Sequence, residues 1–150
     1  MASEISLSER QLEYLRATRP LINSRRSQEA ASHIYAEFAR LPGGSQFVYE
    51  VEKRISSTAK LIDFLVSRFE AMPFDTDPVE KVFEAVGASH ARAGMPVALL
   101  EAGPEIFASS LAKAVHEHGD SWTSDYTAAW RELIQQGVDI QKRSYAEPST

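Results

Sequence analysis

His90 is the residue of this sequence best suited to metal or proton chemistry. It follows Val82 and Val86 at four-residue intervals, so its ring is expected on the apolar, inward face of a helix. A buried neutral imidazole can bind a metal, transfer a proton or donate a hydrogen bond to a backbone carbonyl. The residue pattern alone leaves these three roles open.

The remaining histidines do not have the spacing of a metal site. His116 and His118 stand two residues apart near an expected helix end, so their rings point in different directions. We interpret these two side chains and His33 as surface residues. The sequence contains no His-Glu-x-x-His, Gly-x-Ser-x-Gly or phosphate-binding motif. A zinc enzyme, a serine hydrolase and a nucleotide-binding protein are therefore not expected.

The composition makes further classes of protein unexpected. A chain of 150 residues suits one domain, residues 1–150, and its net charge of −5 makes a nucleic-acid partner unexpected. The longest apolar run, Met95 to Leu100, is far shorter than the roughly 18 residues of a membrane helix, and the N-terminus lacks a signal-peptide pattern. The absence of cysteine excludes disulfides and thiolate metal sites, and it fits a cytoplasmic location.

The elements that position these residues are expected to be helices, because apolar residues recur every three or four positions without strand-like alternation. Ser8 and Gln11 have the spacing of a capping box at the start of the first helix. Gly103 and Pro104 predict a kink or a split in the fifth helix. The six or seven expected helices cover residues 8–20, 26–41, 53–71, 79–93, 96–116 and 123–143, and residues 1–7 and 146–150 are expected to fray.

Several stretches of the sequence resemble the globin family. Residues 86–95 (VGASHARAGM) are similar to the globin helix that carries the proximal histidine and to the corner after it. Residues 121–130 resemble the start of the last helix of bacterial globins, and residues 16–22 and 34–42 resemble the first two helices. The similarity extends over nearly the whole chain. It is greatest to single-domain bacterial haemoglobins, the globin part of flavohaemoglobins and globin-coupled sensors. It implies an all-α, globin-like bundle of six to seven helices around one haem pocket.

The resemblance also implies a set of haem-binding residues. His90 is then the proximal iron ligand of haem b. Phe47 matches the phenylalanine that packs on the haem, and Ser57, ten residues later, matches the distal position. Leu61, one helical turn further, is expected over the iron, and Lys60 is expected at the haem edge, where a cation can pair with a propionate. The other pocket walls are expected to come from Phe38, Val86 and Leu99.

The distal side departs from the family pattern at Ser57. Many globins have histidine or glutamine there, and the serine hydroxyl is too short to reach a bound gas, which favours faster loss of oxygen. A tyrosine of the second helix can compensate, depending on the register of that helix. Counting back seven positions from Pro42 places Tyr35 in the pocket, and counting back eight places Ile34 there. Both registers stay open.

The proximal side departs from flavohaemoglobins in a second way. Those proteins have a tyrosine ten residues after the proximal histidine, where this chain has Leu100, and a glutamate late in the last helix, for which the sequence shows no convincing match. A charge relay that increases electron donation to the iron is therefore not expected.

The function implied by the resemblance is the binding or sensing of a diatomic gas, namely oxygen, nitric oxide or carbon monoxide, by haem b. Two alternatives stay open. A haem enzyme, either a nitric-oxide dioxygenase or a weak peroxidase, would need an external reductase. A haem-free globin-fold module would act through a signalling partner. The chain is expected to be a monomer or a homodimer, with neither nucleic acid nor a membrane as partner.

Overall fold

The secondary structure is all-α over residues 5–47 and 50–146, the parts of the chain that the computed structural model describes. No strand occurs in these residues, so the predicted all-α class is confirmed. The α-helices are α1 (Glu9–Thr18), α2 (Ser24–Arg40), α3 (Val51–Arg68), α4 (Asp77–Arg92), α5 (Val97–His116) and α6 (Ser124–Ala146), with the 3-10 turns η1 (Arg19–Leu21) and η2 (Gly44–Gln46).

Local signals set several helix boundaries. Ser8 and Gln11 form the predicted capping box, in which each side chain accepts a hydrogen bond from the backbone N–H of the other residue. Gly94, with φ of 74°, follows the end of α4 in a conformation that glycine adopts without strain. α5 continues through Pro104, so of the predicted kink or split the split is wrong, and the kink stays a prediction. Gly103 and Pro104 are both buried, and packing of α5 against α2 and α6 offsets the hydrogen bond that proline removes.

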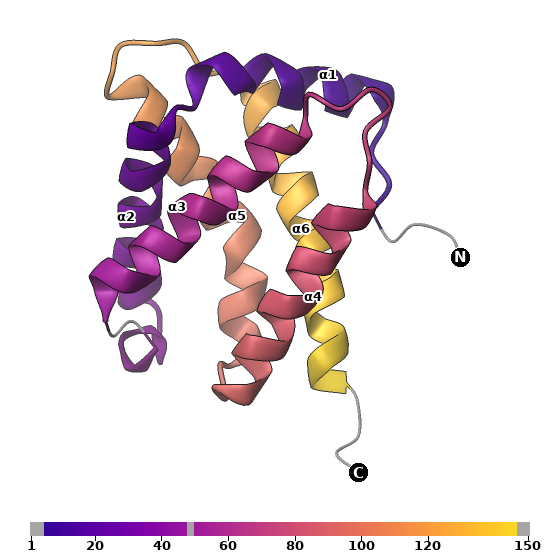
Figure 1. Cartoon of the computed structure of the whole chain (residues 1–150). Coiled ribbons are helices and arrows are strands. Elements are labelled where there is room, and N and C mark those ends of the chain that lie inside the picture. The colour runs from indigo at the N-terminus through magenta and orange to yellow at the C-terminus, as the bar shows by residue number, and fades with distance from the viewer. Residues whose placement is uncertain (1–4, 48–49, 147–150) are drawn as a thin grey trace.

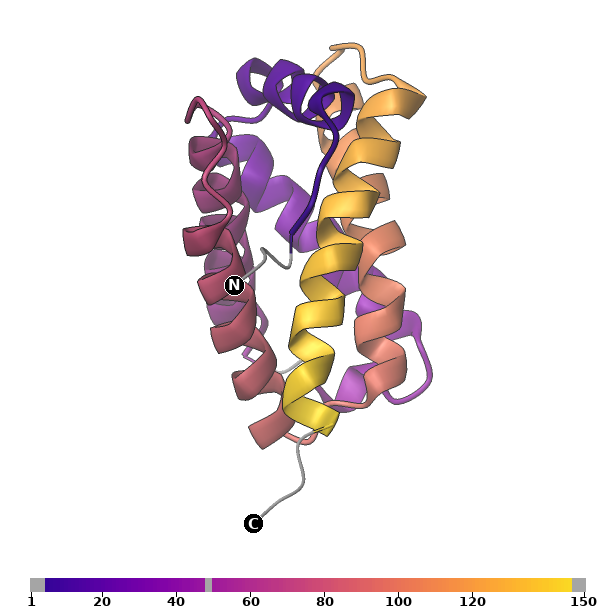
Figure 2. The same cartoon turned by 90° about the vertical axis from the view of Figure 1, so that its right-hand side faces the viewer.

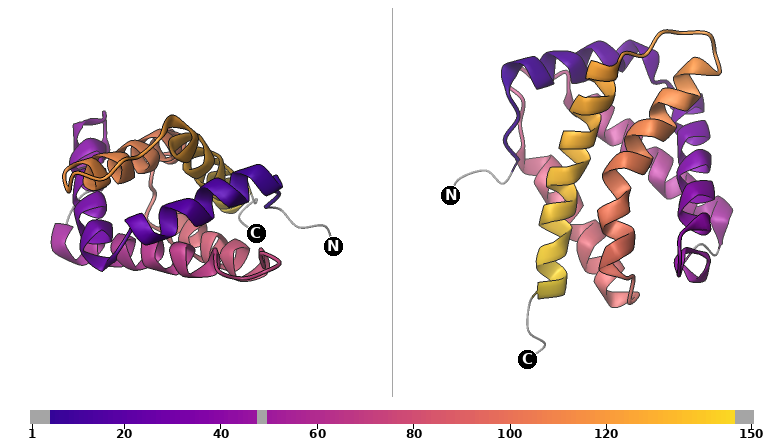
Figure 3. Two further views of the ribbon diagram at one scale, coloured as in Figure 1. Left: turned by 90° about the horizontal axis from the view of Figure 1, so that it is seen from above. Right: turned by 180° about the vertical axis from the view of Figure 1, so that it is seen from behind.

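The helices form two layers that α1 closes at one end. Viewed from above, α3 and α4 lie on one side and α5 and α6 on the other, while α2 closes one edge and contacts both α3 and α5 (Figure 3). α1 crosses the end where α6 begins (Figures 1 and 2). The ends of α2, α4 and α6 and the starts of α3 and α5 therefore meet at the opposite end of the molecule (Figure 1).

The segment before α1 is docked across α4 and α6. Ile5 is 2% exposed, and its N–H donates to Oε1 of Glu80 at 3.0 Å. Ser6 and Gln136 exchange two hydrogen bonds of 2.7 and 2.8 Å between backbone and side-chain amide. The predicted fraying is therefore wrong for residues 5–7, because Ile5 buries its side chain. Residues 1–4 and 147–150 lie outside the described residues, and residue 146 belongs to α6.

The end covered by α1 has a filled core. Trp130 of α6 and Phe69 at the end of α3 are both 0% exposed, and their rings pack edge to face with centroids 5.4 Å apart. The indole Nε1 of Trp130 donates to Oγ1 of Thr18 at 3.1 Å, and that hydroxyl donates to the carbonyl of Leu15 at 2.6 Å. The Trp130 indole and the Thr18 hydroxyl are thus paired, which offsets the cost of burying them.

Two glycines allow α4 and α6 to approach closely. A Cβ atom at Gly87 would lie 2.6 Å from the Cα atom of Gln141, and one at Gly137 would lie 2.5 Å from the ring of Phe83. Neither distance leaves room for a side chain. The close approach brings the second halves of α4 and α6 together, and it places His90, three residues after Gly87, beside Gln141.

Candidate functional site

A cavity of about 370 Å³ lies between the helices at the end opposite α1. This volume falls within the range of small-molecule and cofactor sites. Helices α2 to α6 and the turn after α2 all contribute to its wall. The sequence-predicted residues that line it are Tyr35, Phe38, Phe47, Ser57, Leu61, Val86, His90 and Leu99, together with Ile34, the alternative to Tyr35.

These predicted residues come from separate parts of the chain but share the cavity because of helix register. Ser57 and Leu61 lie one turn apart on α3, and Val86 and His90 lie one turn apart on α4. Phe47 follows η2 and lines the cavity, so it forms part of the wall. Residue 49, expected in the same turn, lies outside the described residues.

His90 is half-buried in the cavity wall and is held by α6. Its Nδ1 atom lies 2.8 Å from Oε1 of Gln141, a side chain only 6% exposed. An amide oxygen only accepts hydrogen bonds, so Nδ1 is the donor and the Nε2 atom keeps its lone pair. Among the described residues, Nε2 has no hydrogen-bond partner. His90 therefore presents a nitrogen atom that can coordinate a ligand.

The environment of His90 keeps its imidazole neutral. Burial is the main cause that lowers the pKa of His90 below its usual value, and the positive charge of Arg54 lowers it further. The hydrogen bond with Gln141 acts in the opposite direction and raises the pKa, but burial outweighs it. A neutral imidazole is the form that binds metals.

A pair of hydroxyl groups lies on the α2–α3 side of the cavity. The Tyr35 hydroxyl is 2.9 Å from Oγ1 of Thr58, which is 9% exposed. Tyr35 and Ile34 both line the cavity, so the two registers left open by the sequence do not exclude each other. Ser57 is exposed, and its hydroxyl donates to the carbonyl of Lys53 at 3.1 Å. The half-buried Tyr35 and the buried Thr58 are therefore the polar pair of this side.

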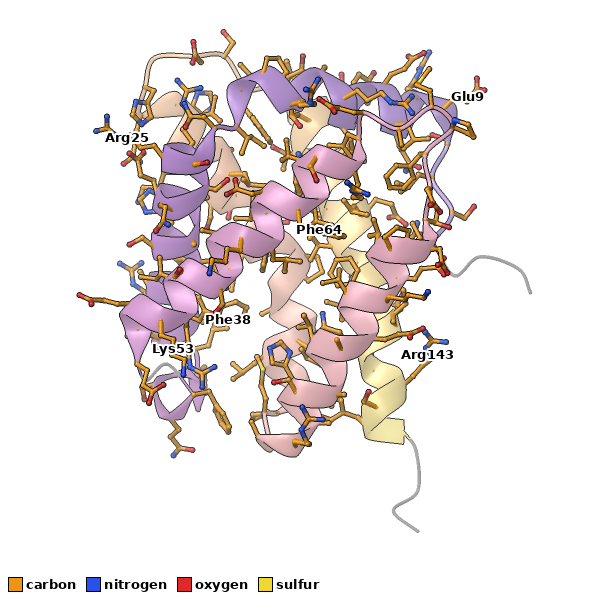
Figure 4. The ribbon with its side chains drawn as sticks, in the orientation of Figure 1. Glu9, Arg25, Phe38, Lys53, Phe64 and Arg143 are labelled. Carbon is orange, nitrogen blue, oxygen red and sulfur yellow. The ribbon has the colours of Figure 1, made fainter. Side chains whose placement is uncertain are left out.

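The cations at the cavity are Lys53 and Arg54, at the start of α3. Glu50, the residue before α3, also lines the cavity and pairs with Lys53 at 3.8 Å. Lys53 and Phe38 project from the same end of the molecule (Figure 4). Lys60, the cation that the sequence predicts, is exposed and does not line the cavity. It precedes Leu61 by one position, which rotates its side chain by about 100° around α3 toward solvent.

Several residues that line the cavity were not predicted from the sequence. Gln141 continues the apolar stripe of Trp130, Ile134 and Val138 on α6, so a polar residue on an inward face was a usable signal. Thr58 and Arg54 flank the predicted Ser57 but gave no local signal. Phe107 on α5 is also in the wall.

The other three histidines lie wholly or partly at the surface, as expected from the sequence. Nε2 of His33 pairs with Glu117 at 2.8 Å, and Nε2 of His118 pairs with Glu29 at 2.7 Å, both in exposed positions that join α2 to the end of α5. In the part of the chain that the structure describes, no three His, Cys, Asp or Glu residues gather into a metal-binding group.

Comparisons with known proteins leave the chain without an assigned family. No protein-family model matches the sequence, and no curated protein matches it either. Within residues 5–47 and 50–146, no helix combines the length and the apolar character that a membrane crossing requires.

Proposed function

We propose that this protein is a globin-like, b-type haem protein that binds a diatomic gas, with His90 as the axial iron ligand. One observation carries the proposal: a neutral histidine, oriented through Nδ1 by a buried amide, presents Nε2 at an apolar cavity. Metal-binding histidines commonly donate their second ring N–H to a fixed acceptor in this way.

The donor set of the cavity fits haem better than a bare metal ion. A protein site for a free ion needs several side-chain ligands. Among the described residues, His90 is the only histidine of the cavity wall, and Glu50 is paired with Lys53. The iron of haem already has four ligands from the porphyrin, so a single imidazole suffices to hold it. A lone, neutral and oriented histidine therefore matches a metal that arrives in a macrocycle.

The other residues of the cavity suit a flat apolar group with acidic substituents. Phe38, Phe47, Leu61, Val86 and Leu99 would contact the porphyrin. In place of the predicted Lys60, the cations of Lys53 and Arg54 would face the propionates, because they lie at the cavity and Lys60 does not.

Haem supplies the iron coordination position at which a diatomic gas binds. The protein sets the polarity around that position and the access of the gas to it. Tyr35 and Thr58 would provide the polar hydroxyls on the α2–α3 side, and their mutual hydrogen bond orients the Tyr35 side chain. Ser57 would contribute less, since its hydroxyl already bonds to the backbone of Lys53. The cytoplasmic location and the monomeric or dimeric state remain predictions from the sequence.

Absorption spectra of the purified protein with one equivalent of haemin test the proposal. The ferric, dithionite-reduced and carbon-monoxide forms should each show a sharp Soret band that shifts between states. His90→Gly should lose this pattern and regain it when imidazole is added, because the free ligand can occupy the vacated position. His116→Ala is the matched control, since His116 is exposed on α5 away from the cavity, and it should leave the spectra unchanged.

The result that rejects the proposal is the absence of these bands in a wild-type protein that stays helical by circular dichroism. That result would favour the haem-free module, and a search for a protein partner would follow. Rapid nitric-oxide turnover with an added reductase would instead show that the haem protein is an enzyme.

A further inference from the structure

Gln141 is buried at a place where a polar side chain needs a specific reason. It is 6% exposed on α6, on the same stripe as the apolar Ile134 and Val138, and its Oε1 accepts the hydrogen bond of His90 Nδ1. Burying an amide is costly unless it is hydrogen-bonded. Gly87 keeps the α4 backbone against the Cα atom of Gln141, which fixes the amide close to His90.

The uncharged state of this acceptor has a chemical consequence. An amide oxygen fixes the proton on Nδ1 but carries no negative charge, so it leaves the imidazole neutral. A carboxylate in the same place would draw that proton more strongly and would increase the electron donation of Nε2 to a bound metal. The groups that face His90 from α3 include the cation of Arg54, which opposes any build-up of positive charge on the ring.

We infer that Gln141 is a positioning residue that fixes His90 as an Nδ1-protonated, weakly donating ligand. The second half of this inference rests on the proposed haem function. Strong electron donation from the axial ligand favours cleavage of an O–O bond, whereas weak donation leaves a bound gas intact. The His90–Gln141 pair therefore selects reversible gas binding over peroxidase chemistry.

The first test needs no haem. Nitrogen NMR of the histidine-labelled protein, at a pH where His90 is neutral, reports which ring nitrogen carries the proton. Wild type should show the Nδ1–H form. Gln141→Leu should shift the population toward Nε2–H, the form that imidazole prefers in water. Gln135→Leu is the control, because Gln135 also lies on α6 but bonds Asp139 and does not line the cavity. An Nε2–H form in the wild type would overturn the inference.

The second test uses the haemin-loaded, reduced protein. Gln141→Glu should raise the iron–histidine stretching frequency in resonance Raman spectra and lower the reduction potential, because the carboxylate increases donation from His90. Gln135→Glu adds the same charge to α6 and should leave the frequency unchanged. A loaded Gln141→Glu protein with wild-type frequency and potential would overturn the tuning role.

The two tests separate the two ideas. If haemin does not bind to the wild type, the proposed function fails while the NMR measurement still decides the tautomer. If haemin binds and Gln141 substitutions change neither readout, the inference fails and the haem function stands.

Discussion

Helices α3 and α6 contribute to both ends of this molecule, the α1 end and the cavity end. Side chains fill the α1 end, whereas the other end encloses the cavity. On α3, Leu65 and Phe69 continue the four-residue stripe of Ser57 and Leu61. Leu65 and Phe69 are fully buried, whereas Ser57 is exposed and Leu61 is half-buried in the cavity wall. A single apolar stripe thus serves a packed core at one end and an open cavity at the other.

The same division appears on α6. Trp130 and Leu133 are 0% exposed in the filled core, while Val138 and Gln141 line the cavity one to three turns later. Close-packed cores resist changes in volume, whereas residues around a cavity retain room. The packed α1 end therefore stabilises the fold, and the opposite end is left available for a ligand.

Truncation should give the largest difference between the two ends. Trp130→Ala should lower the free energy of unfolding by about 3–5 kcal/mol, because it creates a void in a packed core. It also leaves the Thr18 hydroxyl without its indole donor. Leu61→Ala should cost about 2 kcal/mol or less, since that side chain already borders a cavity. Urea unfolding of the haem-free protein measures both values. Equal losses would contradict the division into a packed end and an open end.

Larger side chains on α3 should have effects of intermediate size. At the α1 end a larger side chain should lower stability, whereas at the cavity end it should weaken ligand binding. Leu65→Phe should destabilise the protein by about 1–3 kcal/mol through overpacking, with haemin binding retained by the folded fraction. Leu61→Phe, one turn away, should keep the stability near that of the wild type and reduce haemin affinity, because the ring fills the cavity. Thermal unfolding and haemin titration provide the two readouts. A Leu61→Phe protein that binds haemin normally would place the ligand elsewhere.

Charge at the cavity should give the smallest effect. Lys53→Ala combined with Arg54→Ala should weaken haemin binding by roughly two- to thirtyfold, since each of two exposed ion pairs contributes about 0.2–1 kcal/mol. Lys60→Ala should have no effect, because Lys60 does not line the cavity. Titration with haemin dimethyl ester removes the propionate charges and should abolish the difference between the double variant and the wild type. A persistent difference with the ester would assign another role to the two cations.

Local patterns predicted the helices, and the resemblance to globins predicted Phe47, Ser57 and Leu61 in the cavity wall. Helical spacing placed Val86 and His90 on one inward face, and the capping box at Ser8 set the start of α1. Their prediction succeeds because a helix repeats every 3.6 residues, so neighbours on a face can be counted along the chain. Lys60, one position before Leu61, does not line the cavity for the same reason, since one residue rotates the side chain toward solvent.

Predictions that depended on distant partners were less successful. Ile5 was expected to fray, but Glu80 and the α6 surface give it hydrogen bonding and burial. Pro104 was expected to allow a split, but burial between neighbouring helices keeps α5 continuous. In each case the deciding contact lies far along the sequence, where local propensity carries no information.

The sequence by itself determined an all-helical chain and an inward-facing His90, because both depend on the spacing of neighbouring residues. Only the tertiary structure decided that Gln141, 51 residues away, is the acceptor for His90. The pairing depends on how closely α4 and α6 approach at Gly87 and Gly137. That approach is a property of two packed surfaces, so neither helix alone encodes it.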